Sequence, residues 1–201
     1  FRFNEFLQID LFGKRSDVVT LFQQKMDQEL TPLQLTQHFA DFIYKQFTYV
    51  KGITTVDSTL EEIWQHKSGV CQDFAHMLLA FLRMARIPSR YVSGYICPHL
   101  NGMRGEGATH AWVEVYIPNN GWIGVDPTNN CIVSDTHVRL AVGRHFNDCS
   151  PVKGTYRGGA EHHLHVSVTV SYEDGLNMQG EADVDFVSDG QREQQFVQSQ
   201  Q

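Results

Sequence analysis

The segment from Cys71 to Ala85, which reads CQDFAHMLLAFLRMA, is apolar on nearly every side of the helix that its composition predicts. A helix of this kind is usually central, with other elements packed against it in several directions. The sequence IPSR ends the segment, and RYVSGYI then begins a strand. We therefore expect a fold built around this helix, with neighbours on more than one side.

Helix signals come before this segment and strand signals come after it. Thr31 and Gln34 can form a capping box at the start of one helix, and Ser58 and Glu61 can form another ahead of TLEEIWQH. Further helix and strand patterns indicate an α+β domain, in which helices are followed by antiparallel strands. They comprise a helix over Ser16–Gln28 and strands near Thr109–Ile117, Trp122–Val125, Val138–Val142 and within HHLHVSVTVSYE.

Composition excludes several classes of protein. The 201 residues are 41% hydrophobic and 19% charged, which suits one sizeable core. A formal net charge of -7 argues against nucleic acid or an anionic membrane as a partner. No apolar run reaches the roughly 18 residues of a transmembrane helix. Four cysteines without a C-x-x-C pair favour reduced thiols and a cytoplasmic setting, with the periplasm as the alternative.

One cysteine, one histidine and one aspartate each stand in a local structure that thiol acyl chemistry needs. Cys71 opens the apolar helix, whose N-terminal dipole and free N–H groups stabilise a thiolate. His110 begins the strand THAWVEVYI and can exchange a proton with the thiol and with a leaving amine. Asp126 ends the strand GWIGVD and can fix the tautomer of a histidine. These residues predict a catalytic triad.

The predicted triad requires His110 and Asp126 to lie on the same face of the sheet, and strand alternation shows when they do. On Thr109–Ile117 the apolar residues alternate with a second face that carries His110 and Trp112. A three-residue loop at Pro118–Asn120 would place Trp112 opposite Asp126 and His110 on the diagonal, within reach of a His–Asp hydrogen bond. A two-residue loop would place His110 and Asp126 on opposite faces of the sheet.

Three motifs resemble the bacterial transglutaminase-like superfamily, of the cysteine protease type: GVCQDFAHMLLAFLRMARIPSRYVSGY, THAWVEVYIPNNGW and GVDPTNN. The later VRLAVGRHFNDCSPVKGTYRGG and HVSVTVSY resemble the continuation of the same family. The resemblance implies a papain-like α+β core, with a central cysteine-bearing helix packed on an antiparallel sheet. It also implies catalytic roles for Cys71, His110 and Asp126 without a metal or other cofactor. The family further implies a β-rich N-terminal domain, which we do not expect within these residues.

We divide the chain into four parts on these signals. Residues 1–30 form a lead-in with the first helix, and they are a candidate joint to an upstream domain because the chain starts with FRFNEF rather than methionine. Residues 31–175 form the catalytic core, and 176–190 a C-terminal strand region. The glutamine-rich residues 191–201 are expected to be a disordered tail.

Other candidate residues carry two interpretations each. The Cys71 backbone N–H and the Tyr49 hydroxyl are candidate oxyanion donors, the tyrosine by resemblance to an aromatic position of the superfamily. Trp112 and Trp122 are core residues or walls of a substrate cleft. His162, His163 and His165 could bind a metal, but a solvated strand face is the simpler interpretation. No calcium-loop pattern is present, so calcium dependence is not expected.

The function that these residues favour is cleavage of an amide or peptide bond through a Cys71 thioester. Hydrolysis is preferred to transfer onto an amine, because the loop PHLNGMRGEGAT is polar and glycine-rich rather than a dry lid. Transglutaminase-like transfer to an amine remains open, as do acetyl transfer of the arylamine N-acetyltransferase kind and a catalytically silent binding module. The expected partners are a peptide or protein substrate and an amine co-substrate, with no nucleic acid and no membrane.

Overall fold

The computed structural model describes residues 3–9, 20, 23, 29–55, 58–97, 103–104 and 109–150, and the backbone of four strands at 153–154, 162–166, 184–188 and 196–197. The helix predicted over Ser16–Gln28 lies outside the described residues, apart from Thr20 and Gln23, which are helical.

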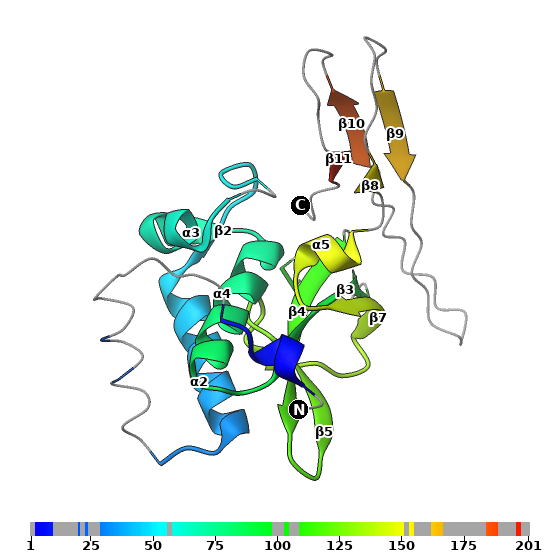
Figure 1. The fold of residues 1–201 in the computed structure, drawn as a ribbon. Helices are drawn as coiled ribbons and strands as arrows, with labels where there is room; N and C mark the ends of the chain where they lie inside the picture. Colours follow the sequence, from blue (N-terminus) through cyan, green and yellow to red (C-terminus); the bar gives the residue numbers. More distant parts are fainter. Residues whose placement is uncertain are drawn as a thin grey trace.

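A five-stranded antiparallel sheet forms one layer of the fold (Figure 1). Its strands lie in the order β6-β5-β4-β3-β7, so that β3 pairs with β4 on one side and with the later β7 on the other. The order shows that β7 crosses from the β6 edge to the opposite edge of the sheet. The bounds are β3 Ser89–Ile96, β4 Thr109–Ile117, β5 Gly121–Asp126, β6 Cys131–Ile132 and β7 His137–Gly143.

Helices cover one face of this sheet. The long α4 packs against β3 and β4, and α2 and α3 pack against α4 from its other sides (Figure 1). The apolar helix is therefore central, as its composition predicts. The mixed helical and antiparallel architecture confirms the expected α+β class. The helices are the 3-10 helix η1 Asn4–Leu7, α2 Pro32–Gln46, α3 Leu60–His66, α4 Cys71–Met84 and the short α5 Phe146–Cys149.

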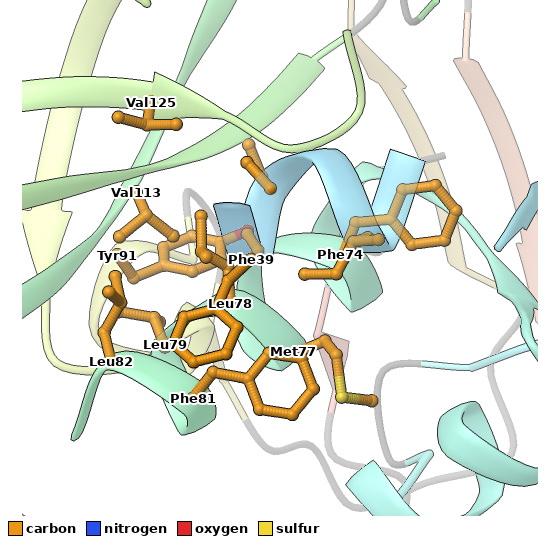
Figure 2. Packing of buried hydrophobic residues seen from close by; sticks show 14 of the residues in the cluster. Phe39, Phe74, Met77, Leu78, Leu79, Phe81, Leu82, Tyr91, Val113 and Val125 are labelled. Carbon is orange, nitrogen blue, oxygen red and sulfur yellow. The ribbon is translucent and has the colours of Figure 1, made fainter. Parts of the chain in front are cut away.

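The core fills the space between α2, α4 and the inner face of the sheet. The rings of Phe39 on α2 and Phe81 on α4 lie 5.0 Å apart, and both side chains are fully buried. Val113 and Val125 supply the sheet side of the same cluster, with Phe74 toward the start of α4 (Figure 2). Burying a large apolar side chain stabilises a fold by about 1.5–3 kcal/mol. This packing fixes α4 against the sheet.

One of the two predicted helix caps is confirmed and the other is wrong by one residue. Thr31 and Gln34 form the capping box of α2. At α3 the box is formed by Thr59 and Glu62 instead of Ser58 and Glu61. The Ser58 hydroxyl accepts a hydrogen bond from the Thr55 backbone N–H, 2.9 Å away, and closes the preceding turn. Ser58 therefore belongs to the turn, and the helix starts one residue later.

An aromatic cluster occupies the far end of the β4–β5 hairpin. Phe3 lies 4.4 Å from Tyr116 and 5.5 Å from Trp122, measured between ring centroids. Phe6 lies 5.4 Å from Trp122, and the Arg90 guanidinium stacks on the same indole at 4.2 Å. Trp122 is thus packed beneath the N-terminal segment.

The remaining strands form two short antiparallel pairs, β8 Lys153–Gly154 with β11 Phe196–Val197 and β9 His162–Val166 with β10 Val184–Ser188. Strand β11 differs from the expectation of disorder over residues 191–201, because Phe196 and Val197 are the β-forming residues in a glutamine-rich stretch. The side chains of His162, His163 and His165 lie outside the described residues.

Candidate active site

The first residue of α4 is Cys71, and its position is fixed by a carboxylate. The Asp73 Oδ2 atom accepts hydrogen bonds from the Val70 backbone N–H at 2.8 Å and from the Thr54 hydroxyl at 2.6 Å. A Cβ atom at Gly69 would collide with the Asp73 side chain, so a residue without a side chain is required there. Asp73 is therefore a capping residue, and Cys71 is held fully buried at the helix N-terminus.

The β4–β5 hairpin has the register that the predicted triad requires. Val113 pairs with Val125 and Ile117 pairs with Gly121, which leaves a three-residue loop at 118–120. A three-residue loop is the length that strand alternation requires for a hydrogen bond between His110 and Asp126. It places His110 and Asp126 on one face of the sheet.

His110 and Asp126 are hydrogen-bonded and fully buried. The His110 Nε2 atom lies 2.9 Å from Asp126 Oδ2. The carboxylate is also bound by the turn that follows it, because Oδ1 accepts from the Thr128 backbone N–H at 2.8 Å and from the Asn129 backbone N–H at 3.3 Å. The Asn129 side-chain amide donates to Oδ2 at 2.7 Å. The DPTN turn thus orients Asp126 toward His110.

A second histidine shares the same carboxylate oxygen, and sequence reasoning missed it. The His137 Nε2 atom lies 3.3 Å from Asp126 Oδ2, and its Nδ1 atom lies 2.9 Å from the Thr136 hydroxyl. The His137 ring meets the Trp112 ring edge-on at 5.1 Å. Only the pairing of β7 with β3 brings His137 here, and nothing local to THVRLAV indicates that pairing.

His110, Asp126 and His137 are the described residues that come together in the way metal ligands do. Their potential ligand atoms all lie within 4.8 Å of one another. The Asp126 oxygen already accepts hydrogen bonds from both rings, however, and these bonds explain the cluster without an ion.

The charges of these buried groups shift their pKa values in opposite directions. Burial opposes the charged form of His110, but the charges of Asp126 and Cys71 and the hydrogen bond with Asp126 outweigh it and raise the His110 pKa to about 10. Burial likewise opposes ionisation of Asp126, but the charge of His110 and hydrogen bonds from His110, His137 and Asn129 hold its pKa well below the usual range. Near neutral pH the pair is therefore an imidazolium and a carboxylate.

This coupling predicts that stability falls as the solution becomes alkaline. Folded His110 binds its proton more tightly than unfolded histidine does, so its stabilising contribution is complete below pH about 6.5 and is lost as the pH rises through about 10. The loss is at most about 1.4 kcal/mol per pH unit in this window. Urea unfolding of the wild type and of an Asp126→Asn variant across the window measures it. Identical pH dependence in the two proteins would contradict the assignment.

Tyr49 lies beside Cys71 because of a short parallel pairing. Strand β1 Thr48–Tyr49 pairs with β2 Ser68–Gly69, and Tyr49 is opposite Gly69. The Tyr49 hydroxyl is buried and has no hydrogen-bond partner among the described residues. Burial raises its pKa, and the charges of Cys71, Asp126 and Asp73 raise it further. Tyr49 therefore keeps its proton and can donate a hydrogen bond.

The two tryptophans have different surroundings. Trp112 is buried, with its ring 6.4 Å from that of His110, and the absence of a side chain at Gly94 leaves room for its indole. Trp122 is four positions from Asp126 along β5 and belongs to the aromatic cluster described above. The structure thus brings Trp112 to the histidine and does not bring Trp122 there.

A separate pocket of about 480 Å³ lies between α2 and the β5–β6 edge. Val125 and Cys131, the neighbours of Asp126 in sequence and in strand pairing, line its sheet side. Cys71 and His110 are not among the lining residues. The pocket therefore borders the neighbours of Asp126 and is not lined by the predicted nucleophile or the predicted base.

A cysteine-bearing helix on an antiparallel sheet is the arrangement of papain-like folds. The family model described as the transglutaminase-like superfamily core matches residues 20–127, and the chain belongs to that superfamily. Its members are usually enzymes.

Relatives and solved structures agree with this assignment. An uncharacterized protein of Mycobacterium leprae is 33% identical over 173 residues, which cover 85% of this chain and 61% of that protein. A protein-glutamine gamma-glutamyltransferase of Pseudomonas aeruginosa is 34% identical over 94 residues, 43% of this chain and 14% of that one. The crystal structure of a putative cysteine protease from Cytophaga hutchinsonii superposes with a TM-score of 0.61 at 26% identity, covering 73% of this chain and 48% of that chain. The chain thus spans about three fifths of the Mycobacterium leprae relative.

All four cysteines, Cys71, Cys97, Cys131 and Cys149, are free thiols. Among the described residues, no helix combines the length and the apolar character needed to cross a membrane.

Proposed function

We propose that the protein cleaves an amide or peptide bond through a thioester at Cys71, and that water completes the reaction. The observation that carries this proposal is the buried arrangement of His110 between Asp126 and Cys71. Nε2 of His110 faces the carboxylate. Nδ1 is buried without a hydrogen-bond partner among the described residues, while the Cys71 side chain is close enough to raise the His110 pKa. Nδ1 is therefore the nitrogen that exchanges protons with the thiol.

The two half-reactions follow from this geometry. The Cys71 thiolate attacks the carbonyl carbon of the amide, and the carbonyl oxygen becomes an oxyanion. The Cys71 backbone N–H and the Tyr49 hydroxyl are the proposed donors to that oxygen. His110 gives its Nδ1 proton to the departing nitrogen, the C–N bond breaks, and the amine leaves. His110 then takes a proton from water, the resulting hydroxide attacks the thioester, and the acid is released with Cys71 restored.

Asp126 orients His110 throughout this sequence. Its ionised carboxylate can only accept hydrogen bonds, so Nε2 of His110 must carry a proton. The second proton of the ring, on Nδ1, is then the one that moves to and from the reacting atoms. Each step uses side chains of this chain together with a peptide or protein substrate. We propose a cytoplasmic setting for the protein, with the periplasm as the alternative.

Transfer to an amine is the second candidate, and the likeness to a protein-glutamine gamma-glutamyltransferase favours it. The two reactions share the thioester and differ only in the second nucleophile. We favour hydrolysis because Met103 and Arg104, in the loop ahead of His110, are partly exposed, and a transferase must keep water away from its thioester.

The partition of the thioester tests this proposal. Unfolded casein is incubated with the protein and with millimolar fluorescent alkylamine, and new peptide termini, free ammonia and fluorescent adduct are measured together. We expect free acid and cleaved peptide to exceed the adduct, and the Cys71→Ala variant to form neither. An excess of adduct over free acid would favour the transglutaminase reaction. Equal activity in wild type and Cys71→Ala would contradict thiol catalysis.

A further inference from the structure

Arg104 is held in a fixed position relative to the triad by Asn129. The Arg104 backbone N–H donates to the Asn129 side-chain oxygen at 2.8 Å, and the Asn129 side-chain amide donates to the Arg104 carbonyl at 3.1 Å. The same amide donates to Asp126 Oδ2 at 2.7 Å. One side chain therefore links the backbone of Arg104 to the carboxylate that orients His110.

The Arg104 guanidinium packs on an aromatic ring of α2. Its central carbon is 4.5 Å from the centroid of the Tyr44 ring, a cation–π contact that orients the side chain. Burial and three negative charges raise the Tyr49 pKa, and the Arg104 charge acts in the opposite direction. The Arg104 charge therefore acts on the hydroxyl that we propose as an oxyanion donor.

No carboxylate among the described residues neutralises this cation. Asp126 is the acceptor of five hydrogen bonds from His110, His137, Thr128 and Asn129. Asp73 accepts from Val70 and Thr54. The Arg104 Nη1 atom is buried and has no hydrogen-bond partner among the described residues. An unpaired buried donor is costly, and a guanidinium binds carboxylates especially well, through paired hydrogen bonds.

We propose that Arg104 binds a carboxylate of the substrate next to the amide that Cys71 attacks. The protein would then prefer peptides with a free carboxylate beside the scissile bond, either a C-terminus or an acidic side chain. This inference rests on the proposed function, because it takes Cys71 as the attacking atom. It makes Arg104 a specificity-determining residue and leaves the triad chemistry unchanged.

Two thiol reagents of nearly equal size test the inference without a known substrate. Iodoacetate carries a carboxylate and iodoacetamide carries a neutral amide, and each alkylates Cys71 with loss of iodide. A maleimide pair, 3-maleimidopropionate and its amide, places the carboxylate further from the reacting carbon. Labelling of Cys71 is followed by peptide mapping. Burial raises the pKa of the competing thiols Cys131 and Cys149 to about 11.

The measured quantity is the ratio of the anionic to the neutral labelling rate at Cys71. We expect the Arg104→Gln variant to lower this ratio about fivefold in at least one reagent pair, the upper range for a partly exposed ion pair. The matched control is Arg139→Gln, which removes the same charge from a half-exposed arginine paired with Glu114. A change below twofold in both pairs, or an equal fall in the control, would overturn the inference.

Two competitors separate the sources of the carboxylate. N-acetylalanine offers a C-terminal carboxylate, and the α-amide of N-acetylaspartate offers only a side-chain carboxylate. Each compound is tested for how strongly it slows iodoacetamide labelling of Cys71 in the wild type and in Arg104→Gln. The compound with the stronger effect in the wild type, lost in the variant, shows which kind of carboxylate Arg104 binds. Slow labelling by both iodo reagents would count against Cys71 as a nucleophile, whereas the rate ratio tests Arg104 at any absolute rate.

Discussion

Replacing His110 with alanine is expected to lower turnover by about 10²–10⁴-fold, the usual contribution of a general acid–base group. The variant loses the group that protonates the leaving amine and activates the attacking water. It also loses the partner of a buried Asp126 carboxylate, so its free energy of unfolding falls as well. Casein hydrolysis per folded molecule measures the catalytic effect, with circular dichroism and urea unfolding to establish the folded fraction.

His66→Ala is the matched control for this variant. His66 is an exposed histidine in the last turn of α3, and its removal should leave turnover within twofold. A His110→Ala protein that is folded and cleaves casein at the wild-type rate would remove His110 from the mechanism.

Asp126→Asn is expected to lower turnover by as much as about 10⁴-fold, the effect of this change in a serine protease triad. Two backbone N–H groups point at Oδ1, so the amide oxygen of the asparagine takes that position. Its NH₂ group, a hydrogen-bond donor, then faces His110 and His137, where the wild-type carboxylate oxygen accepts their hydrogen bonds. Nε2 of His110 must become an acceptor, which moves the proton to Nδ1 and removes the site that receives a proton from the thiol.

The protonation of the His110 ring distinguishes this mechanism from simple unfolding. Near neutral pH, nitrogen NMR of the His110 ring should show protons on both Nε2 and Nδ1 in the wild type, and a neutral ring with its proton on Nδ1 alone in Asp126→Asn. The control is Asp135→Asn, which changes an exposed aspartate in the turn that precedes β7. Unchanged protonation of the ring together with normal turnover would show that Asp126 does not orient the histidine.

Sequence patterns could predict the features that depend on local periodicity. The central place of α4 followed from its apolar surface. For the β4–β5 hairpin, the sequence set only a condition, a three-residue loop at Pro118–Asn120, and the strand register meets it. The cap at Ser58 was wrong because serine and threonine are adjacent there and both can cap. Local sequence does not say which of two neighbouring hydroxyls will close the turn before the helix.

The features that sequence could not predict depend on strand order and on contacts between distant segments. His137 reaches Asp126 only because β7 pairs with β3 across the sheet rather than with β6. Arg104 reaches Tyr44 because Asn129 fixes its backbone, a contact between residues 25 positions apart. Trp122 joins Phe3 because η1 folds against the hairpin, and the strand pattern around Trp122 contains no sign of that contact.

The shared oxygen of Asp126 has a consequence for local unfolding. It joins β4 to β7, which is an edge strand, through His110 and His137, although β3 separates these two strands in the sheet. Edge strands open more readily than central ones, because they are paired on one side only. Opening of β7 therefore withdraws His137 from the carboxylate before the rest of the fold is disturbed. The alignment of Asp126 thus depends on how firmly the edge of the sheet remains closed.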